Sequence, residues 1–356
     1  MKRALGGLLL VAHGLAHALP ATQAGAVGRS WLFTPLGLDA MAQRWIVALL
    51  STLAMAGFVV AGFGVWGVPS FRRAWRRAGL VAAGASMVLI PLFWLNAYGV
   101  VGLAIDVAVV LGLRSLPVVW STGRLSRKRP GSVKEITLEL AHIGAVAFVG
   151  WLTLASLAAP WHRLWGSTAA ELAMPLPGDE SLDGPPTYWI QHAVSIDAPP
   201  GIVWPWLAQL GTDRGGFYSY AWLERLFGID VRNAGRIHEE WQDVRTGGFI
   251  TAAPAGYLGF DRPLGWRLGL VEPGRVMVLE TWGAFVLEPT PEGGTRFIVR
   301  TRSGGGPDLL GLATAWFGLT VFEPAHFIME RQMLLGVKRR AEGTIRESHA
   351  VREARP

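Results

Sequence analysis

The sequence predicts two parts of different fold class. Residues 1–160 are expected to form an all-α transmembrane bundle of four or five helices. Residues 188–345 are expected to form an α+β domain with an antiparallel sheet and a long C-terminal helix. Two observations carry this prediction: the chain is 51% hydrophobic and only 17% charged, and its long apolar runs all lie before residue 160.

A third observation places the boundary. The Pro/Gly/acidic stretch "PLPGDESLDGPPT" at 175–187 is typical of the segments that separate domains. We therefore expect 161–187 to be a linker, and the charged end at 346–356 to be a disordered tail.

The net charge of +7 lies entirely in the apolar part. Residues 1–185 hold 15 Lys and Arg against 8 Asp and Glu, whereas residues 186–356 hold 18 of each. Basic residues between apolar runs indicate membrane topology, so we expect no nucleic-acid partner. The chain has no cysteine, which excludes disulfides, thiolate metal sites and cysteine nucleophiles. No metal or cofactor is expected.

Five apolar runs are candidate spans. They are 4–19, 45–66, 78–95, 98–113 and 136–158. The clearest is 45–66, because its 22 uncharged residues reach roughly 33 Å at ~1.5 Å per residue and Trp45 and Trp66 stand at its ends. The weakest is 4–19, for which a cleavable signal peptide is the alternative interpretation.

Loop charge predicts the orientation. The loops at 70–77 and 114–134 are rich in arginine and lysine, whereas the short "NAYG" turn between them has no charge. Both basic loops are expected on the cytoplasmic side, which places the chain after 136–158 on the outer face of the cell membrane.

Ionisable residues inside these runs need partners or a function. They are His13, His17, Asp106, Glu139 and His142. His13 and His17 share a helix face, as do Glu139 and His142. The favoured interpretation is structural pairing within the bundle. The alternative is a membrane sensor or a redox or proton carrier.

The elements of the second part follow in order. "YWIQHAVSIDAPP" at 188–200 alternates as a strand does, and apolar residues then recur at helical spacing over 202–210 and 219–227. The second helix is expected to begin at an N-cap Ser219 and to pack its Trp/Leu stripe inward. Short strands follow, and "TPEGG" joins the last two as a hairpin. A helix with Pro324 in its first turn ends the chain.

This order of elements predicts one sheet curled around one long helix, with room for an apolar cavity between them. The stretches "SIDAPPGIVWPWLAQLGTDRGGFYSYAWLERLFG", "NAGRIHEEWQ", "LVEPGRVMVLETW" and "EPAHFIMERQMLLGVKRRAE" resemble the SRPBCC superfamily (START, polyketide-cyclase-like) over about 160–345. The chain departs from that pattern at "VRTGGFI", where an acidic residue would follow the glycine. The resemblance implies a helix-grip fold and a hydrophobic cavity, with activities that range from lipid or polyketide binding to cyclase or dehydratase chemistry.

The leading functional hypothesis is a membrane-anchored domain that binds a lipid, isoprenoid or polyketide-like molecule. The expected ligand contacts are Tyr218, Tyr220, Trp222, Trp282, Arg300, His326, Met329 and Met333. The alternative is an enzyme of the cyclase, dehydratase or hydrolase type. Its base would be His326 oriented by Glu323 or Glu330, and its acid would be Tyr218 or Tyr220. No phosphate-binding, dinucleotide or zinc-protease motif is present.

Overall fold

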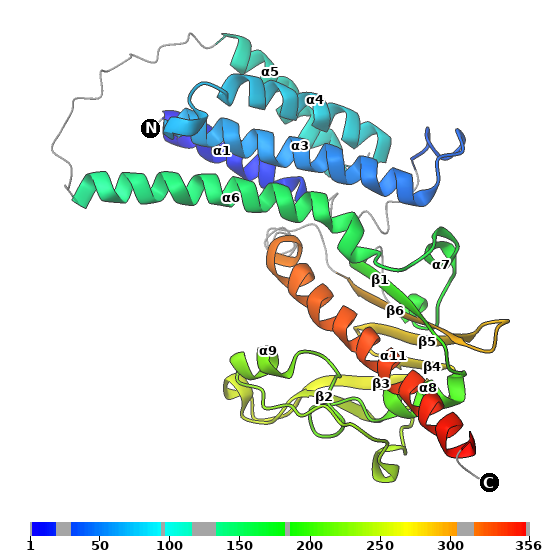
Figure 1. The fold of residues 1–356 in the computed structure, drawn as a ribbon. Helices are drawn as coiled ribbons and strands as arrows, with labels where there is room; N and C mark the ends of the chain where they lie inside the picture. Colours follow the sequence, from blue (N-terminus) through cyan, green and yellow to red (C-terminus); the bar gives the residue numbers. More distant parts are fainter. Residues whose placement is uncertain are drawn as a thin grey trace. The chain divides into compact units, whose positions relative to one another are not determined.

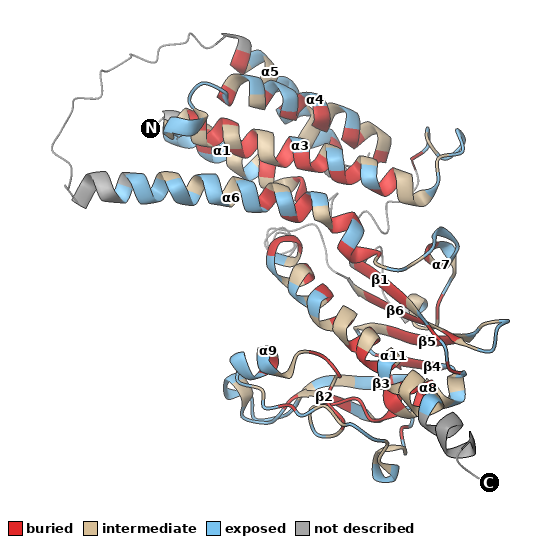
Figure 2. Ribbon diagram, in the orientation of Figure 1, coloured by how far each residue is buried: buried red, intermediate tan, exposed pale blue. Residues whose placement is uncertain are grey.

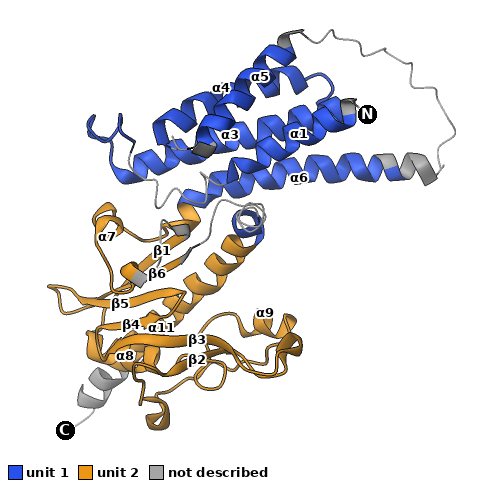
Figure 3. Ribbon diagram, turned by 180° about the vertical axis from the view of Figure 1, so that it is seen from behind, with its two compact units in different colours: residues 1–160, 306–321 blue, residues 161–305, 322–356 orange. Residues whose placement is uncertain are grey.

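The computed structural model of the chain describes residues 2–18, 30–93, 97–115, 133–181, 186–304 and 317–353. The chain divides into two compact units, which Figure 3 shows in different colours. Unit 1 comprises residues 1–160 and 306–321, and unit 2 comprises residues 161–305 and 322–356.

Unit 1 is built from helices in its described residues. They are α1(Lys2–Ala16), α3(Ala40–Trp66), η1(Pro69–Phe71), α4(Trp75–Phe93), α5(Ala97–Ser115) and most of α6(Val133–Arg163) (Figure 1). The side chain of Asp39 caps α3 by accepting a hydrogen bond from the backbone N–H of Ala42 at 2.7 Å. Gly67 ends the helix with a left-handed φ of 91°.

Three of the helices are long and apolar enough to cross a membrane. They cover Ala40–Trp66, Trp75–Phe93 and Glu139–Arg163. The runs expected as spans at 4–19 and 98–113 form the shorter apolar helices Ala4–Ala16 and Gly99–Leu113. The 15 residues of α1 reach roughly 23 Å, less than the roughly 30 Å of a bilayer core. Most of the basic loop at 114–134 lies outside the described residues.

The surface of α6 is also consistent with a membrane protein. Leu140, Ile143 and Leu154 are exposed along it, as the pale blue of Figure 2 shows for much of this helix. A row of exposed large apolar side chains on one helix is typical of a surface that meets lipid or another protein.

Small residues bring the helices of unit 1 close together. A Cβ atom built on Gly57 of α3 would lie 2.8 Å from the carbonyl oxygen of Ala78. One built on Gly62 would lie 2.7 Å from the carbonyl oxygen of Gly7 in α1. Contacts through small residues are a common means of packing helices in membranes.

Unit 2 contains a six-stranded antiparallel sheet in the order β1-β6-β5-β4-β3-β2. The strands are β1(Pro186–Ile196), β2(Phe249–Ala253), β3(Leu264–Glu272), β4(Val276–Leu279), β5(Gly283–Pro289) and β6(Thr295–Gly304). The predicted meander and the hairpin at "TPEGG" are confirmed. The α-helices of the unit, beyond the end of α6, are α7(Ala169–Ala173), α8(Pro200–Ala208), α9(Ala221–Leu226) and α11(Glu323–Glu353).

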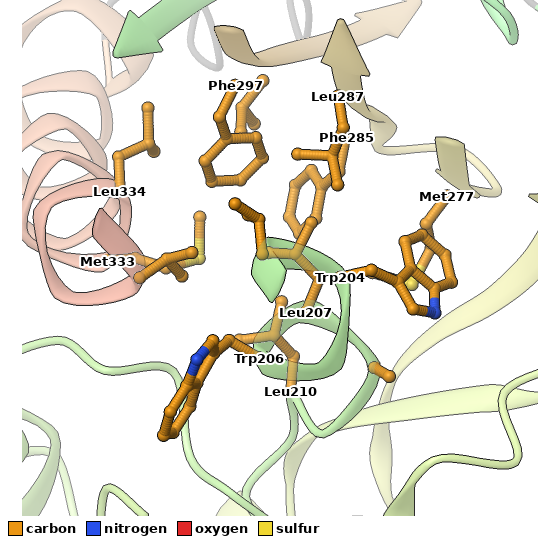
Figure 4. Close-up of a cluster of buried hydrophobic side chains, with 14 of the residues drawn as sticks. Trp204, Trp206, Leu207, Leu210, Met277, Phe285, Leu287, Phe297, Met333 and Leu334 are labelled. Carbon is orange, nitrogen blue, oxygen red and sulfur yellow. The ribbon is translucent and has the colours of Figure 1, made fainter. Parts of the chain in front are cut away.

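The main core lies between one face of this sheet and the helices α8 and α11. Figure 4 shows Phe285 and Leu287 of β5 beside side chains of both helices. The alternate residues Ala284 and Val286 belong to a second cluster on the opposite face. Both faces of the central strands are therefore covered.

The segment 161–181 is not a linker. It belongs to unit 2, and Leu176 is buried in the second cluster against the sheet. Thr168 and Glu171 form a reciprocal capping box that begins α7. Only 182–185 of the expected linker lies outside the described residues.

Helix α9 differs from its expected orientation. It begins after Tyr220, which makes no side-chain cap, and not at Ser219. Trp222 is 61% exposed and Leu226 is 73% exposed, so the apolar stripe that was expected to pack inward faces outward. At the end of the chain α11 continues to Glu353, so most of the expected tail is helical and only 354–356 lies outside the described residues.

Candidate functional site

A cavity of about 210 Å³ lies within unit 2, between α11 and strands β2 to β5. Its size is just below the range of roughly 300–1,000 Å³ that is usual for small-molecule sites. Most of the lining is apolar. It consists of Leu210, Thr212, Phe217, Ser219, Glu224, Ile229, Ile250, Ala252, Trp266, Leu279, Trp282, Phe285, His326, Met329, Glu330 and Met333.

One wall carries a buried array of two histidines and a carboxylate. His326 and Glu330 lie one turn apart on α11, with His326 Nε2 2.8 Å from Glu330 Oε2. The other carboxylate oxygen, Oε1, is 2.6 Å from Nδ1 of His192 on β1. The Nε2 atom of His192 lies 2.5 Å from the carbonyl oxygen of His162. The array therefore joins the cavity wall to the first strand of the sheet.

Both ring nitrogens of His192 have a partner. Its Nε2 atom faces a carbonyl oxygen, which can only accept, so Nε2 must donate. Its Nδ1 atom faces Glu330. Burial alone would raise the pKa of Glu330, but the charges of His326 and His192 and their hydrogen bonds outweigh burial and lower it to about 2. An ionised carboxylate can only accept, so Glu330 is suited to its position between the ring nitrogens of His192 and His326.

Glu323, the other carboxylate considered for orienting His326, has a different partner. Its two oxygens accept hydrogen bonds from Nε and Nη2 of Arg163 at 2.6 and 2.7 Å, and both side chains are buried. Glu330 is therefore the carboxylate that contacts His326.

Glu224 on α9 provides a second acidic group in the cavity lining. The residue is 9% exposed, and its Oε2 atom has no hydrogen-bond partner in the part of the chain that the structure describes. Burial raises the pKa of this carboxyl, while the neighbouring Arg225 acts in the opposite direction. Glu224 was not among the expected site residues, although it is the only carboxylate in the sequence between Asp213 and Asp230.

Four of the eight expected ligand contacts line the cavity. These are Trp282, His326, Met329 and Met333. The indole of Trp282 lies 5.0 Å from that of Trp266 and 5.3 Å from the ring of His326, centroid to centroid. Trp266, Phe217 and Phe285 complete the aromatic lining and were not among the expected contacts.

Tyr218, Tyr220 and Trp222 are not among the lining residues. Tyr218 is 1% exposed in the main core, where its hydroxyl donates to the carbonyl oxygen of Trp206 and accepts from Gln209 Nε2. Burial raises its pKa to about 12, which makes it a poor acid near neutral pH. Tyr220 packs near the exposed Trp222, with ring centroids 6.3 Å apart.

Arg300 is also absent from the cavity lining. It donates to Gln191 Oε1 at 2.8 Å, to the carbonyl oxygens of Glu171 and Met174, and to the carboxylate of Asp179. Arg300 thus fastens the segment around α7 to the sheet.

The polar residues of unit 1 form two separate groups. Asp106 Oδ1 lies 2.8 Å from Nε2 of His13, and Asp106 Oδ2 accepts a hydrogen bond from Ser86, which also contacts His17 Nε2 at 2.8 Å. The structure therefore brings His13, His17 and Asp106 together through Ser86. His142 Nε2 instead lies 2.9 Å from the hydroxyl oxygen of Ser70, and Glu139 is exposed.

Among the residues that the structure describes, no three His, Asp or Glu side chains are grouped so that they could hold a metal ion. Comparison with protein-family models, with curated proteins and with solved structures finds no match for the chain.

Proposed function

We propose that unit 2 is a helix-grip domain of the SRPBCC type that binds a hydrophobic small molecule in its cavity. Unit 1, in this proposal, is a multi-pass bundle of four or five spans that anchors the domain to the lipid bilayer. The observation that carries the proposal is the cavity of about 210 Å³ between the sheet and α11, whose walls are mostly aromatic and aliphatic. An apolar pocket with a few convergent polar groups is the usual form of a ligand site.

The test uses the full chain in lipid nanodiscs, from which small molecules are extracted and identified by mass spectrometry. Ala252→Phe should fill the cavity, because Ala252 lines it. Ala255→Phe is the matched control, since it adds the same side chain at an exposed position outside the lining. We expect a molecule that co-purifies with the wild type and the control but not with Ala252→Phe. Equal recovery from all three would contradict the proposal.

The sidedness proposed from loop charge has its own test. The natural chain has no cysteine, so a single introduced cysteine reports its own position. Glu292→Cys, in the exposed β5–β6 turn of unit 2, should react in intact cells with a membrane-impermeant maleimide. Arg73→Cys, in the basic loop at 70–77, should react only after the cells are opened. The reverse pattern would place unit 2 in the cytoplasm.

Acid–base catalysis is a second candidate function, and the array of His326, Glu330 and His192 favours it. A histidine oriented by a carboxylate that is held in turn by another group is a common arrangement of a general base. If the cavity is catalytic, His326→Gln should abolish conversion of the bound molecule and retain its binding. If the site only binds, wild type and variant should both return that molecule unchanged.

A further inference from the structure

We propose that the ligand of the cavity in unit 2 is a hydrophobic organic cation, an amine or ammonium group carried on an apolar body, and that Glu224 is its counter-ion. The inference rests on the proposed binding function and adds the chemical class of the ligand. It starts from the unpartnered Oε2 atom of Glu224, which lines a mostly apolar cavity.

A buried carboxyl group without a partner is costly, and proteins retain such groups mainly where a ligand or a reaction uses them. Glu224 lies on the short helix α9, whose outward face carries Trp222 and Leu226. The raised pKa of Glu224 fits a carboxyl whose charge has no partner until a cation arrives.

The charges around the cavity leave Glu224 available for a cation. Neither lysine nor arginine occurs among the described residues that line it. The second acid, Glu330, already accepts hydrogen bonds from His192 and His326. His326, which also lines the cavity, is paired with the carboxylate of Glu330, so Glu224 is the acid in the lining that remains for a cation.

The walls add a second form of attraction for a cation. Phe217, Trp266, Trp282 and Phe285 line the same cavity, and the rings of Trp266 and Trp282 lie 5.0 Å apart. Aromatic faces attract organic cations, and indole does so most strongly. A neutral apolar ligand would use the same walls but would leave Glu224 without a partner.

The experiment compares two probes of the same shape. Benzyltrimethylammonium carries a permanent charge, and neopentylbenzene is its neutral carbon isostere. Both are titrated calorimetrically into the full chain in lipid nanodiscs, and titrations into empty nanodiscs correct for partition into lipid. The variants are Glu224→Gln and, as a matched control, Glu292→Gln, which removes the same charge from an exposed turn outside the cavity.

We expect the wild type and Glu292→Gln to bind the cation more tightly than the isostere. Glu224→Gln should weaken cation binding by about 30-fold or more, because one partner of a desolvated charge pair is lost. Its affinity for the neutral probe should stay within about twofold, since that probe makes no ionic contact. Trp282→Leu is a second variant, which keeps the test valid if Glu224→Gln folds poorly. It should weaken binding of the cation at least about threefold more than binding of the isostere.

Three outcomes would overturn the inference: a preference for neopentylbenzene, a cation affinity that Glu224→Gln leaves unchanged, or equal losses for both probes in Glu224→Gln. In each of these cases the proposed function would stand, because a probe still binds and Ala252→Phe should still block it. If neither probe binds the wild type beyond lipid partition, the proposed binding function fails as well.

Discussion

Replacing Glu330 by glutamine should destabilise unit 2 by about 3 kcal/mol at neutral pH. The carboxylate contacts His192 and His326, and glutamine would remove the buried negative charge that both rings face. A fall of the pKa of Glu330 from 4.5 to about 2 corresponds to about 3 kcal/mol, at about 1.4 kcal/mol per unit. Measured losses on breaking buried ion pairs, about 3–5 kcal/mol, agree with that figure.

The sign of the pH dependence follows from the direction of the shift. A carboxyl whose pKa is lower in the folded state contributes its full stabilisation above the unfolded value of 4.5. That contribution is lost as the pH falls from 4.5 through about 2. The difference in stability between wild type and Glu330→Gln should therefore be largest near pH 7 and should shrink as the pH falls through this window.

Native-state hydrogen exchange of the full chain is the suitable assay, because it reports unit 2 separately. The slowest amides of β5 and β6 give the free energy of opening of the sheet. Glu292→Gln serves as the control for the removal of a charge from an exposed turn, and we expect it to exchange as the wild type does. A stability difference for Glu330→Gln that does not change between pH 7 and pH 3 would refute the proposed ion pair.

Three further predictions concern stability. Glu323→Gln should lower the free energy of unfolding of unit 2 by about 3–5 kcal/mol in the same exchange assay, because Arg163 stays buried without its partner. Replacing Arg163 by Met and Glu323 by Leu together should recover most of that loss, since no charge then remains buried. A double variant as unstable as the single one would contradict this. Gly336→Ala should lower the free energy of unfolding by about 1–3 kcal/mol, because its Cβ would lie 2.4 Å from a backbone oxygen. Gly343→Ala on the same helix meets open space and should raise that free energy by about 0.5–1 kcal/mol. The midpoints of urea unfolding of the two variants should therefore move in opposite directions. Asp106→Asn should lower the thermal unfolding temperature of unit 1 in detergent, because it removes the charge of the carboxylate that accepts from Ser86 and contacts His13. An unchanged temperature would mean that this network adds no stability.

Much of unit 2 follows from its local sequence pattern. Period-two alternation locates β1, and the turn residues between β5 and β6 determine their pairing, because both signals come from residues that are adjacent in the chain. The interval of four residues between His326 and Glu330 also made that pair recognisable, since such residues share a helix face.

The orientation of α9 could not be obtained in this way. An apolar stripe predicts the buried face only where the helix packs against a solid core. In α9 the inner face meets a cavity and carries Glu224, while Trp222 and Leu226 face outward. The apolar stripe of α9 therefore lies on its exposed face, opposite to the buried face that the pattern predicts.

Contacts between distant residues were equally inaccessible. His192 lies 138 residues before Glu330. In the sequence it is one residue of an alternating strand pattern, which gives no sign of a partner so far along the chain. Arg300 was expected as a ligand contact. Apart from Gln191 on β1, its hydrogen-bond partners lie on the segment 171–179, which had been taken for part of a linker.

The pairing of the first and last parts of unit 2 has a consequence for the order of folding. Two buried polar contacts, Arg163 with Glu323 and His192 with Glu330, join segments that are 160 and 138 residues apart. Both need α11, which the ribosome makes after the strands of the sheet. Contacts of such long sequence separation form slowly, because a large loop must close before they stabilise the fold. During synthesis the finished sheet must therefore wait for α11 with part of one apolar face uncovered, and in that interval the nascent unit depends most on chaperones to avoid aggregation.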